Sequence, residues 1–198
     1  MAKLYFSYAA MNAGKSTLLL QASYNYRERG METLLFTAAL DDRAGAGVIA
    51  SRIGVSCEAR LFTAADDLFA AVETAHAHTP YSCVFVDEAQ FLTREQVWQL
   101  ARVADRLNVP VMCYGLRTDF QGKLFPGSSE LLAIADTLRE VRTICHCGAK
   151  ATMVVRLGPD GRPLTEGDQV DIGGNDKYIS LCRRHWEETV GNWPLESR

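Results

Sequence analysis

The chain has 198 residues, of which 47 % are hydrophobic and 23 % are charged, and its formal net charge is −3. This composition is typical of a soluble globular protein, and no internal repeat, heptad or low-complexity tract is present. The small negative charge argues against broad electrostatic attachment to nucleic acid. No apolar run reaches membrane-spanning length and no secretory signal is visible, so we expect no nucleic-acid partner, no membrane partner and a cytoplasmic location.

β-like runs alternate with helix-compatible segments in the first two thirds of the chain. The runs cover residues 3–8, 33–39, 81–87 and 109–116. The helix-compatible segments begin near Gly14, Ala65, Thr93 and Ser128. The third and fourth runs are almost continuously apolar, as expected when helices cover both faces of a sheet. The sequence therefore predicts an α/β fold with a parallel sheet, whose ligands gather at the carboxyl ends of the strands.

The first motif follows the first predicted strand and matches the phosphate-binding loop G-x-x-x-x-G-K-[ST] except at its first position, where Ala9 stands. In such a loop backbone N–H groups surround the phosphates, the Lys15 ammonium reaches the β- and γ-phosphates, and the Ser16 hydroxyl ligates Mg²⁺. The predicted nucleotide-binding residues are Ala9, Ala10, Met11, Asn12, Ala13, Gly14, Lys15 and Ser16. We expect Ala9 to keep a negative φ. The alternative is an ordinary strand–loop–helix corner.

The second motif, residues 84–91, is an apolar strand that ends in two adjacent carboxylates and resembles a Walker B element. Asp87 at the strand end is expected to bind Mg²⁺ beside Ser16. Glu88 could accept a proton from an attacking oxygen, which is water in an ATPase and a substrate hydroxyl in a kinase. The alternative is a solvated corner with Thr93 as a helix cap.

The residue pattern of the chain changes after about residue 141, where glycines interrupt every potential helix. We therefore expect a nucleotide-binding domain over 1–141, a smaller domain over 142–191 and a loose tail over 192–198.

The smaller domain carries the third motif, Cys145-His146-Cys147 followed by Cys182 and His185. Three thiolates and an imidazole suit tetrahedral Zn²⁺. If residues 145–147 are extended, the two cysteines point to one side and His146 points away, which favours His185 as the fourth ligand. The predicted metal ligands are Cys145, Cys147, Cys182 and His185. The alternative is two unrelated groups of buried thiols.

Several motifs in this order, over nearly the whole chain, resemble the type II thymidine kinases. The resemblance rests on residues 11–16, 87–91, 114–120 and 172–178 and on the predicted zinc ligands. It implies a P-loop, RecA-like domain with ATP, Mg²⁺ and a zinc-bearing lasso. It also implies that Glu88 is the catalytic base, which deprotonates the 5′-hydroxyl of thymidine as that oxygen attacks the γ-phosphate of ATP.

The resemblance further assigns binding residues. The apolar wall of the nucleoside pocket would contain Met11, Phe91, Leu116, Phe120 and Phe125. The lasso would cover the base with Gln169, Val170, Asp171, Ile172, Gly173 and Tyr178. Asp87 and Gln90 join the nucleotide-binding group, and Asp41 and Arg43 resemble a family pair near the active site. From spacing alone, Phe120 and Phe125 could equally be aromatics that anchor loops.

As partners, the resemblance implies thymidine as substrate, dTTP as feedback inhibitor and a homotetramer. A P-loop ATPase or helicase-like motor with a zinc ribbon is the alternative function, although the chain offers no second RecA-like lobe. A third possible function, a zinc-ribbon module that binds nucleic acid, would give Glu88 no chemical role.

Overall fold

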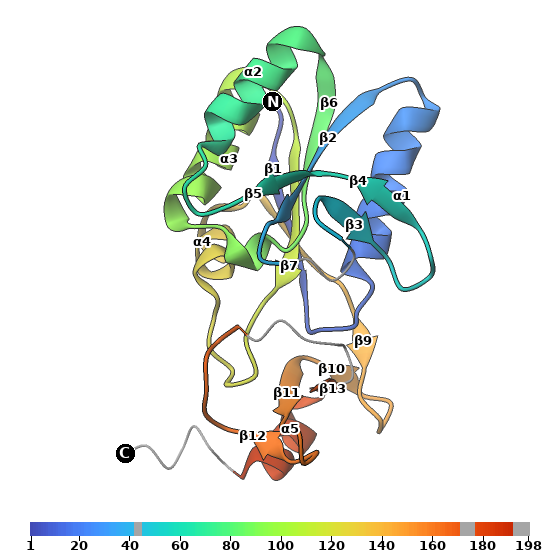
Figure 1. The fold of residues 1–198 in the computed structure, drawn as a ribbon, viewed down its shortest axis with the longest axis vertical. Coiled ribbons are helices and arrows are strands. Elements are labelled where there is room, and N and C mark those ends of the chain that lie inside the picture. Colours follow the sequence, from blue (N-terminus) through green and yellow to red (C-terminus); the bar gives the residue numbers. More distant parts are fainter. Residues whose placement is uncertain (42–44, 171–176, 192–198) are drawn as a thin grey trace.

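The computed structural model describes residues 1–41, 45–170 and 177–191 (Figure 1). A six-stranded sheet forms the centre of the larger part, in the order β5-β2-β6-β7-β1-β8, and every neighbouring pair is parallel. Its strands are β1 Leu4–Ala9, β2 Glu32–Ala38, β5 Arg60–Phe62, β6 Tyr81–Val86, β7 Val111–Leu116 and β8 Thr137–Glu140. The predicted parallel α/β architecture is confirmed.

Helices cover both faces of this sheet. They are α1 Lys15–Glu28, α2 Leu68–His78, α3 Arg94–Leu107 and α4 Pro126–Ile134. Figure 1 shows α1 on one side of the sheet and α2, α3 and α4 on the other. Successive side chains of β6 alternate between the two faces: Val84 and Val86 belong to the core under α2 and α3, and Cys83 and Phe85 to the core under α1. Burial on both faces explains why β6 is continuously apolar.

Several short elements were not predicted from the sequence. The hairpin of β3 Val48–Ala50 and β4 Ser56–Glu58 and the edge strand β5 have three residues each, too few to establish a periodicity. The other edge strand, β8, reads Thr-Leu-Arg-Glu and has little apolar content. The start of α2 is also later than predicted, because the Asp67 side chain accepts a hydrogen bond from Ala70 N (3.0 Å) and caps the helix there.

The smaller part contains short antiparallel strands and one helix. Its elements are β9 Thr143–Ile144, β10 Lys150–Ala151, β11 Met153–Leu157, β12 Pro163–Leu164, β13 Tyr178–Leu181 and α5 Arg183–Val190. β10 pairs with β9, and β11 lies between β12 and β13. This part has its own apolar cluster, centred on Val155 and Trp186.

The smaller part lies beyond the carboxyl ends of the parallel strands (Figure 1). Side chains join it to the larger part: Ser180 Oγ donates to Met11 O (2.6 Å), and Arg117 Nη2 donates to Thr152 O (3.1 Å). The buried Trp186 donates through Nε1 to Phe120 O (3.3 Å) and Val154 O (3.0 Å). The carboxyl ends of the strands therefore face the smaller part.

None of the helices in the described ranges combines the length and apolar character that spanning a bilayer requires.

Candidate active site and metal centre

The phosphate loop turns from β1 into α1 as the motif predicts. Gly14 caps α1 with φ 81°, and Asn12 also adopts a positive φ of 64°. Lys15, the first residue of α1, is 8 % exposed and donates through Nζ to Ala10 O (3.3 Å). The first backbone N–H groups of α1 therefore face the loop, an arrangement that suits an anion.

Ala9 is the last residue of β1, where it pairs with Leu116 of β7. It is not among the residues with positive φ, which confirms the expectation of a negative angle. The glycine of the motif is dispensable here because the backbone leaves the strand only after this position.

The loop opens onto a large pocket of about 1540 Å³, part of which is open to solvent. Its walls are residues 11–17 and 48–53 together with Thr37, Asp41, Asp87, Glu88 and Leu116. The predicted residues Ala9 and Ala10 are buried and do not line it. Among the described lining residues, the cationic side chains are Lys15 and Arg52, and Arg52 Nη2 contacts Asn12 Oδ1. We call this the phosphate-side pocket.

Asp87 follows β6 and is 4 % exposed. Burial, and then the neighbouring Glu88 charge, raise the pKa of Asp87 to about 7, whereas the hydrogen bond with the Ser16 side chain and the Lys15 charge oppose this rise. The structure therefore brings Ser16, Asp87 and Lys15 together. A buried carboxylate and a hydroxyl are oxygen ligands of the kind that Mg²⁺ prefers, so these residues fit the predicted ion.

Glu88 occupies the left-handed backbone region with φ 51° and precedes the 3₁₀ turn η1 Ala89–Phe91. Such a conformation costs a non-glycine residue about 1 kcal/mol or more. Glu88 lines the phosphate-side pocket and also a second pocket, as do Met11, Asp41 and Leu116. A carboxylate is thus held at the junction of the two pockets.

The second pocket encloses about 580 Å³, part of which is open to solvent. Its lining comprises Met11, Asp41, Glu88, Gln90, Phe91, Leu116, Thr118, Asp119, Phe120, Phe125, Val154, Gln169, Val170 and Tyr178. The Phe91 and Phe125 rings meet edge to face with centroids 6.1 Å apart. We call it the aromatic pocket.

The aromatic pocket gathers all eight described residues that the resemblance assigns to the nucleoside: Met11, Phe91, Leu116, Phe120, Phe125, Gln169, Val170 and Tyr178. Three further residues of that set, Asp171, Ile172 and Gly173, and also Arg43, lie outside the described residues. Gln90, assigned to the nucleotide, lines this pocket and is not among the residues that line the phosphate-side pocket.

Side-chain amides connect the segment 165–170 to the loop after β7. Gln169 Nε2 donates to Asp119 Oδ2 (2.8 Å), and Gln121 Nε2 donates to Thr165 O (3.3 Å). Asp119 is 4 % exposed, and its Oδ1 also accepts from the backbone N–H groups of Gln121 (2.9 Å) and Lys123 (2.8 Å). The Asp119 carboxylate therefore holds both the loop after β7 and Gln169 of the segment 165–170, which covers the aromatic pocket.

Arg156 of β11 packs against Phe120, one of the residues that line the aromatic pocket. Its guanidinium carbon lies 3.9 Å from the centroid of the Phe120 ring, and Nη1 donates to Asp168 O (2.8 Å). The side chain is buried, and its Nε has no hydrogen-bond partner in the described part of the chain. Gly167 has φ 127°, and a Cβ there would lie 2.5 Å from Arg156 Nη2. The guanidinium thus joins the ring of Phe120 to the backbone that covers the pocket.

Sequence reasoning missed Thr17, Thr37 and residues 48–53 of the phosphate-side pocket, and Thr118, Asp119 and Val154 of the aromatic pocket, as lining residues. Thr118 and Asp119 lie within the family motif 114–120 but had no assigned role. Asp119 and the glycine three residues later, Gly122, are typical turn residues, and Gly122 N donates a hydrogen bond to Asp119 O (3.2 Å) that closes the turn. Thr17 directly follows the phosphate-loop motif, whereas Thr37, residues 48–53 and Val154 have no local pattern that could identify them.

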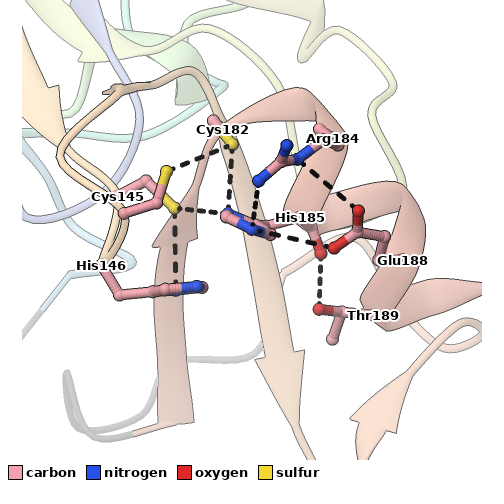
Figure 2. Close-up of polar contacts among 8 residues, drawn as sticks. Cys145, His146, Cys182, Arg184, His185, Glu188 and Thr189 are labelled. Carbon is pink, nitrogen blue, oxygen red and sulfur yellow. Dashed lines mark hydrogen bonds and ion pairs between the residues drawn. The ribbon is translucent and has the colours of Figure 1, made fainter.

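The predicted metal ligands Cys145, Cys147, Cys182 and His185 converge, with ligand atoms all within 4.8 Å of one another. Figure 2 shows Cys145 and Cys182 directed at His185, whose Nδ1 lies 3.3 Å and 3.4 Å from their sulfurs. Cys147 Sγ lies 4.0 Å from Cys182 Sγ, near the roughly 3.8 Å expected for two thiolates on one tetrahedral zinc ion. All six cysteines are described and none is disulfide-bonded. The group can hold a metal ion such as Zn²⁺.

The two halves of the metal centre form differently. Cys182 caps α5, which places His185 in the first turn as expected. The extended conformation considered for residues 145–147 does not form: the segment turns, and Gly148 N donates to Cys145 O (2.8 Å). His146 consequently does not point away but stacks on His185, with ring centroids 4.3 Å apart (Figure 2). His146 is not part of the converging group.

Local hydrogen bonds favour the thiolate form of Cys145. Desolvation raises the pKa of its thiol, but hydrogen bonds from the backbone N–H groups of Cys147 and Cys182 and from His185 outweigh it and lower the pKa to about 6. The thiolate is the form that binds metals.

Comparisons with known proteins agree with this arrangement. A family model described as "Thymidine kinase" matches residues 2–186. The chain is 70 % identical over 189 residues to a protein of Agrobacterium fabrum named "Thymidine kinase", an alignment that covers 96 % of this chain and 98 % of the relative. Relatives of the same name from Jannaschia sp. and Photobacterium profundum are 66 % and 57 % identical over 195 and 191 residues, covering 98 % and 96 % of this chain and all of each relative.

Proposed function

The chain belongs to the thymidine kinase family, and we propose that it transfers the γ-phosphate of ATP to the 5′-hydroxyl of thymidine, producing ADP and dTMP. As an ATP:thymidine 5′-phosphotransferase it would serve pyrimidine deoxynucleoside salvage. The observation that carries this proposal is the position of Glu88, which lines both the phosphate-side pocket and the aromatic pocket.

The phosphate-side pocket would bind ATP. Backbone N–H groups at the start of α1 and the Lys15 ammonium would hold the β- and γ-phosphates. Ser16 and Asp87 would hold Mg²⁺, which would offset the negative charge of the phosphates. The buried, hydrogen-bonded contact between Ser16 and Asp87 supports this assignment.

The aromatic pocket would bind thymidine. The rings of Phe91, Phe120 and Phe125 offer an apolar surface for the base and its 5-methyl group. Gln169, Val170 and Tyr178 would cover the base, and we extend this cover to residues 171–173 on the resemblance alone. Because Met11 and Leu116 line both pockets, the nucleoside and the terminal phosphate would meet beside them.

At the junction, Glu88 would accept the proton of the 5′-hydroxyl while that oxygen forms a bond to the γ-phosphorus. The bond between the γ-phosphorus and the β–γ bridging oxygen breaks, and ADP leaves with that electron pair. Lys15 would stabilise the charge that develops on the transferred group.

The metal centre would have a structural role in a separate lasso domain over 142–191. The four converging residues would supply all the ligands that a tetrahedral zinc ion takes, as in structural rather than catalytic zinc sites. The centre ties both ends of the segment 148–181, which includes the cover of the aromatic pocket. On the resemblance we also propose a homotetramer, feedback inhibition by dTTP and a cytoplasmic location.

The test is a transfer assay with γ-labelled ATP, Mg²⁺ and thymidine. Labelled dTMP is the expected product, and formation should fall about 10²-fold or more in Glu88→Gln, while binding of an ATP analogue persists. The control is Glu95→Gln, which changes an exposed glutamate paired with Arg102 on α3. Release of phosphate without transfer to thymidine would instead support an ATPase.

A further inference from the structure

The Gln90 side chain, in η1, is 1 % exposed and is hydrogen-bonded at both ends of its amide. Its Oε1 accepts from Leu116 N (2.9 Å), and its Nε2 donates to Glu88 Oε2. A backbone N–H can only donate, so the amide oxygen must face Leu116. The amide nitrogen must therefore face Glu88, and Oε2 of Glu88 must act as an acceptor.

The surroundings of Gln90 leave this amide little choice of conformation. A Cβ on Gly115 would lie 2.9 Å from both Gln90 N and Gln90 Oε1, so β7 approaches the amide as closely as a glycine allows. A Cβ on Gly127 of α4 would lie 2.5 Å from Ala89 O. The turn that carries Gln90 is thus packed between a strand and a helix.

From this geometry we propose that Gln90 is a positioning residue, which holds the Glu88 carboxylate at the junction of the two pockets and ties it to Leu116 in their common wall. The inference rests on the proposed function and names how its base is placed. It replaces the assignment of Gln90 to the nucleotide, since Gln90 lines the aromatic pocket and not the phosphate-side pocket.

Positioning matters here because a glutamate side chain has several rotatable bonds and Glu88 sits on a backbone of unusual conformation. A displacement of about 1 Å from the productive geometry can cost about 10²-fold in rate. One bond from Gln90 to Oε2 fixes the orientation of the carboxylate relative to the strand that bears Leu116.

Two substitutions separate positioning from support of the fold. Gln90→Glu keeps an oxygen that can accept from Leu116 N but replaces the donor to Glu88 with a like charge. We expect kcat to fall roughly 10- to 100-fold, with KM for ATP and for thymidine within about 3-fold of native. Gln90→Met preserves the approximate volume, removes both hydrogen bonds and should lower kcat in the same range.

Gln99→Glu is the matched control. Gln99 is also a buried glutamine whose Oε1 accepts from a backbone N–H, that of Leu68 (2.8 Å), but it lies on α3 away from both pockets. This variant should lose stability and keep kcat. Thermal unfolding and binding of an ATP analogue would be measured for all three variants.

A double-mutant cycle with Glu88→Gln completes the test. In the Glu88→Gln background, Gln90→Glu should change the residual rate by less than about 2-fold, because no carboxylate remains to be positioned. Native kcat in folded Gln90→Glu, or a raised KM for ATP with unchanged kcat, would overturn the proposal. If Glu88→Gln itself keeps native transfer, the assignment of the base in the proposed function fails instead.

Discussion

The two sides of the candidate active site are built differently. The phosphate-side pocket depends on consecutive residues, 11–17, held by the parallel sheet and by the start of α1. The aromatic pocket depends on side chains from segments far apart in the chain, joined through Asp119, Arg156 and the metal centre. Nucleotide binding and nucleoside binding should therefore respond to different substitutions.

The largest expected effect is on the phosphate side. In Lys15→Ala the loop loses the cation that would hold the β- and γ-phosphates, so ATP affinity and transfer should fall together, the latter about 10²-fold or more. Calorimetric titration with an ATP analogue and the transfer assay would measure the two losses. Lys3→Ala, an exposed lysine before β1, serves as the control. Unchanged ATP affinity in Lys15→Ala would contradict the assignment of this loop.

Disruption of the metal centre should affect the aromatic pocket instead of the phosphate-side pocket. Cys182→Ser removes one of four ligands and frees the segment 148–181 from one tether, so KM for thymidine should rise about 10-fold or more, and proteolysis of this segment should accelerate. ATP affinity should change far less. Metal analysis should give about one zinc per native chain and much less in the variant. Cys57→Ser, a half-buried cysteine outside the converging group, should behave as native. Native thymidine affinity in metal-free protein would refute the structural role.

A smaller effect is expected from Arg156→Met, which keeps apolar volume behind Phe120 but removes the cation and the bond to Asp168 O. KM for thymidine should rise about 5-fold while kcat and ATP affinity stay near native, because the ring and the cover lose a shared support. The control is Arg162→Met, at an exposed position of the same part. An equal effect in both variants would argue against a specific role of Arg156.

The smallest effect concerns stability. Because burial raises the pKa of Asp87 to about 7 in the folded chain, its ionisation opposes folding, and this cost grows as pH rises from the unfolded value near 3.8 through 7. In the absence of Mg²⁺ and nucleotide, the gain in unfolding free energy from Asp87→Asn should be about 1–2 kcal/mol larger at pH 8 than at pH 5.5. Denaturant titrations at the two pH values would measure this. An equal gain at both would show that Asp87 is not held at a raised pKa.

Groups that are close in the chain could be placed together from the sequence. The loop from Met11 to Ser16, the adjacent Asp87 and Glu88, and the spacing of Cys182 and His185 each follow from one local element. The conformation of residues 145–147 could not be predicted, because a turn and an extended segment can both bring two cysteines together. Only the hydrogen bond from Gly148 N distinguishes the two.

By itself, the sequence predicted the parallel α/β fold, the turn from β1 into α1 and the four Cys and His side chains that converge, since each depends on local periodicity or on residue types with narrow chemistry. The tertiary structure decided which side chains meet across long separations. Gln90 reaches Leu116 across 26 positions, and Gln169 reaches Asp119 across 50. Such contacts depend on how strands and loops pack in space, and packing leaves no periodic signal in the chain.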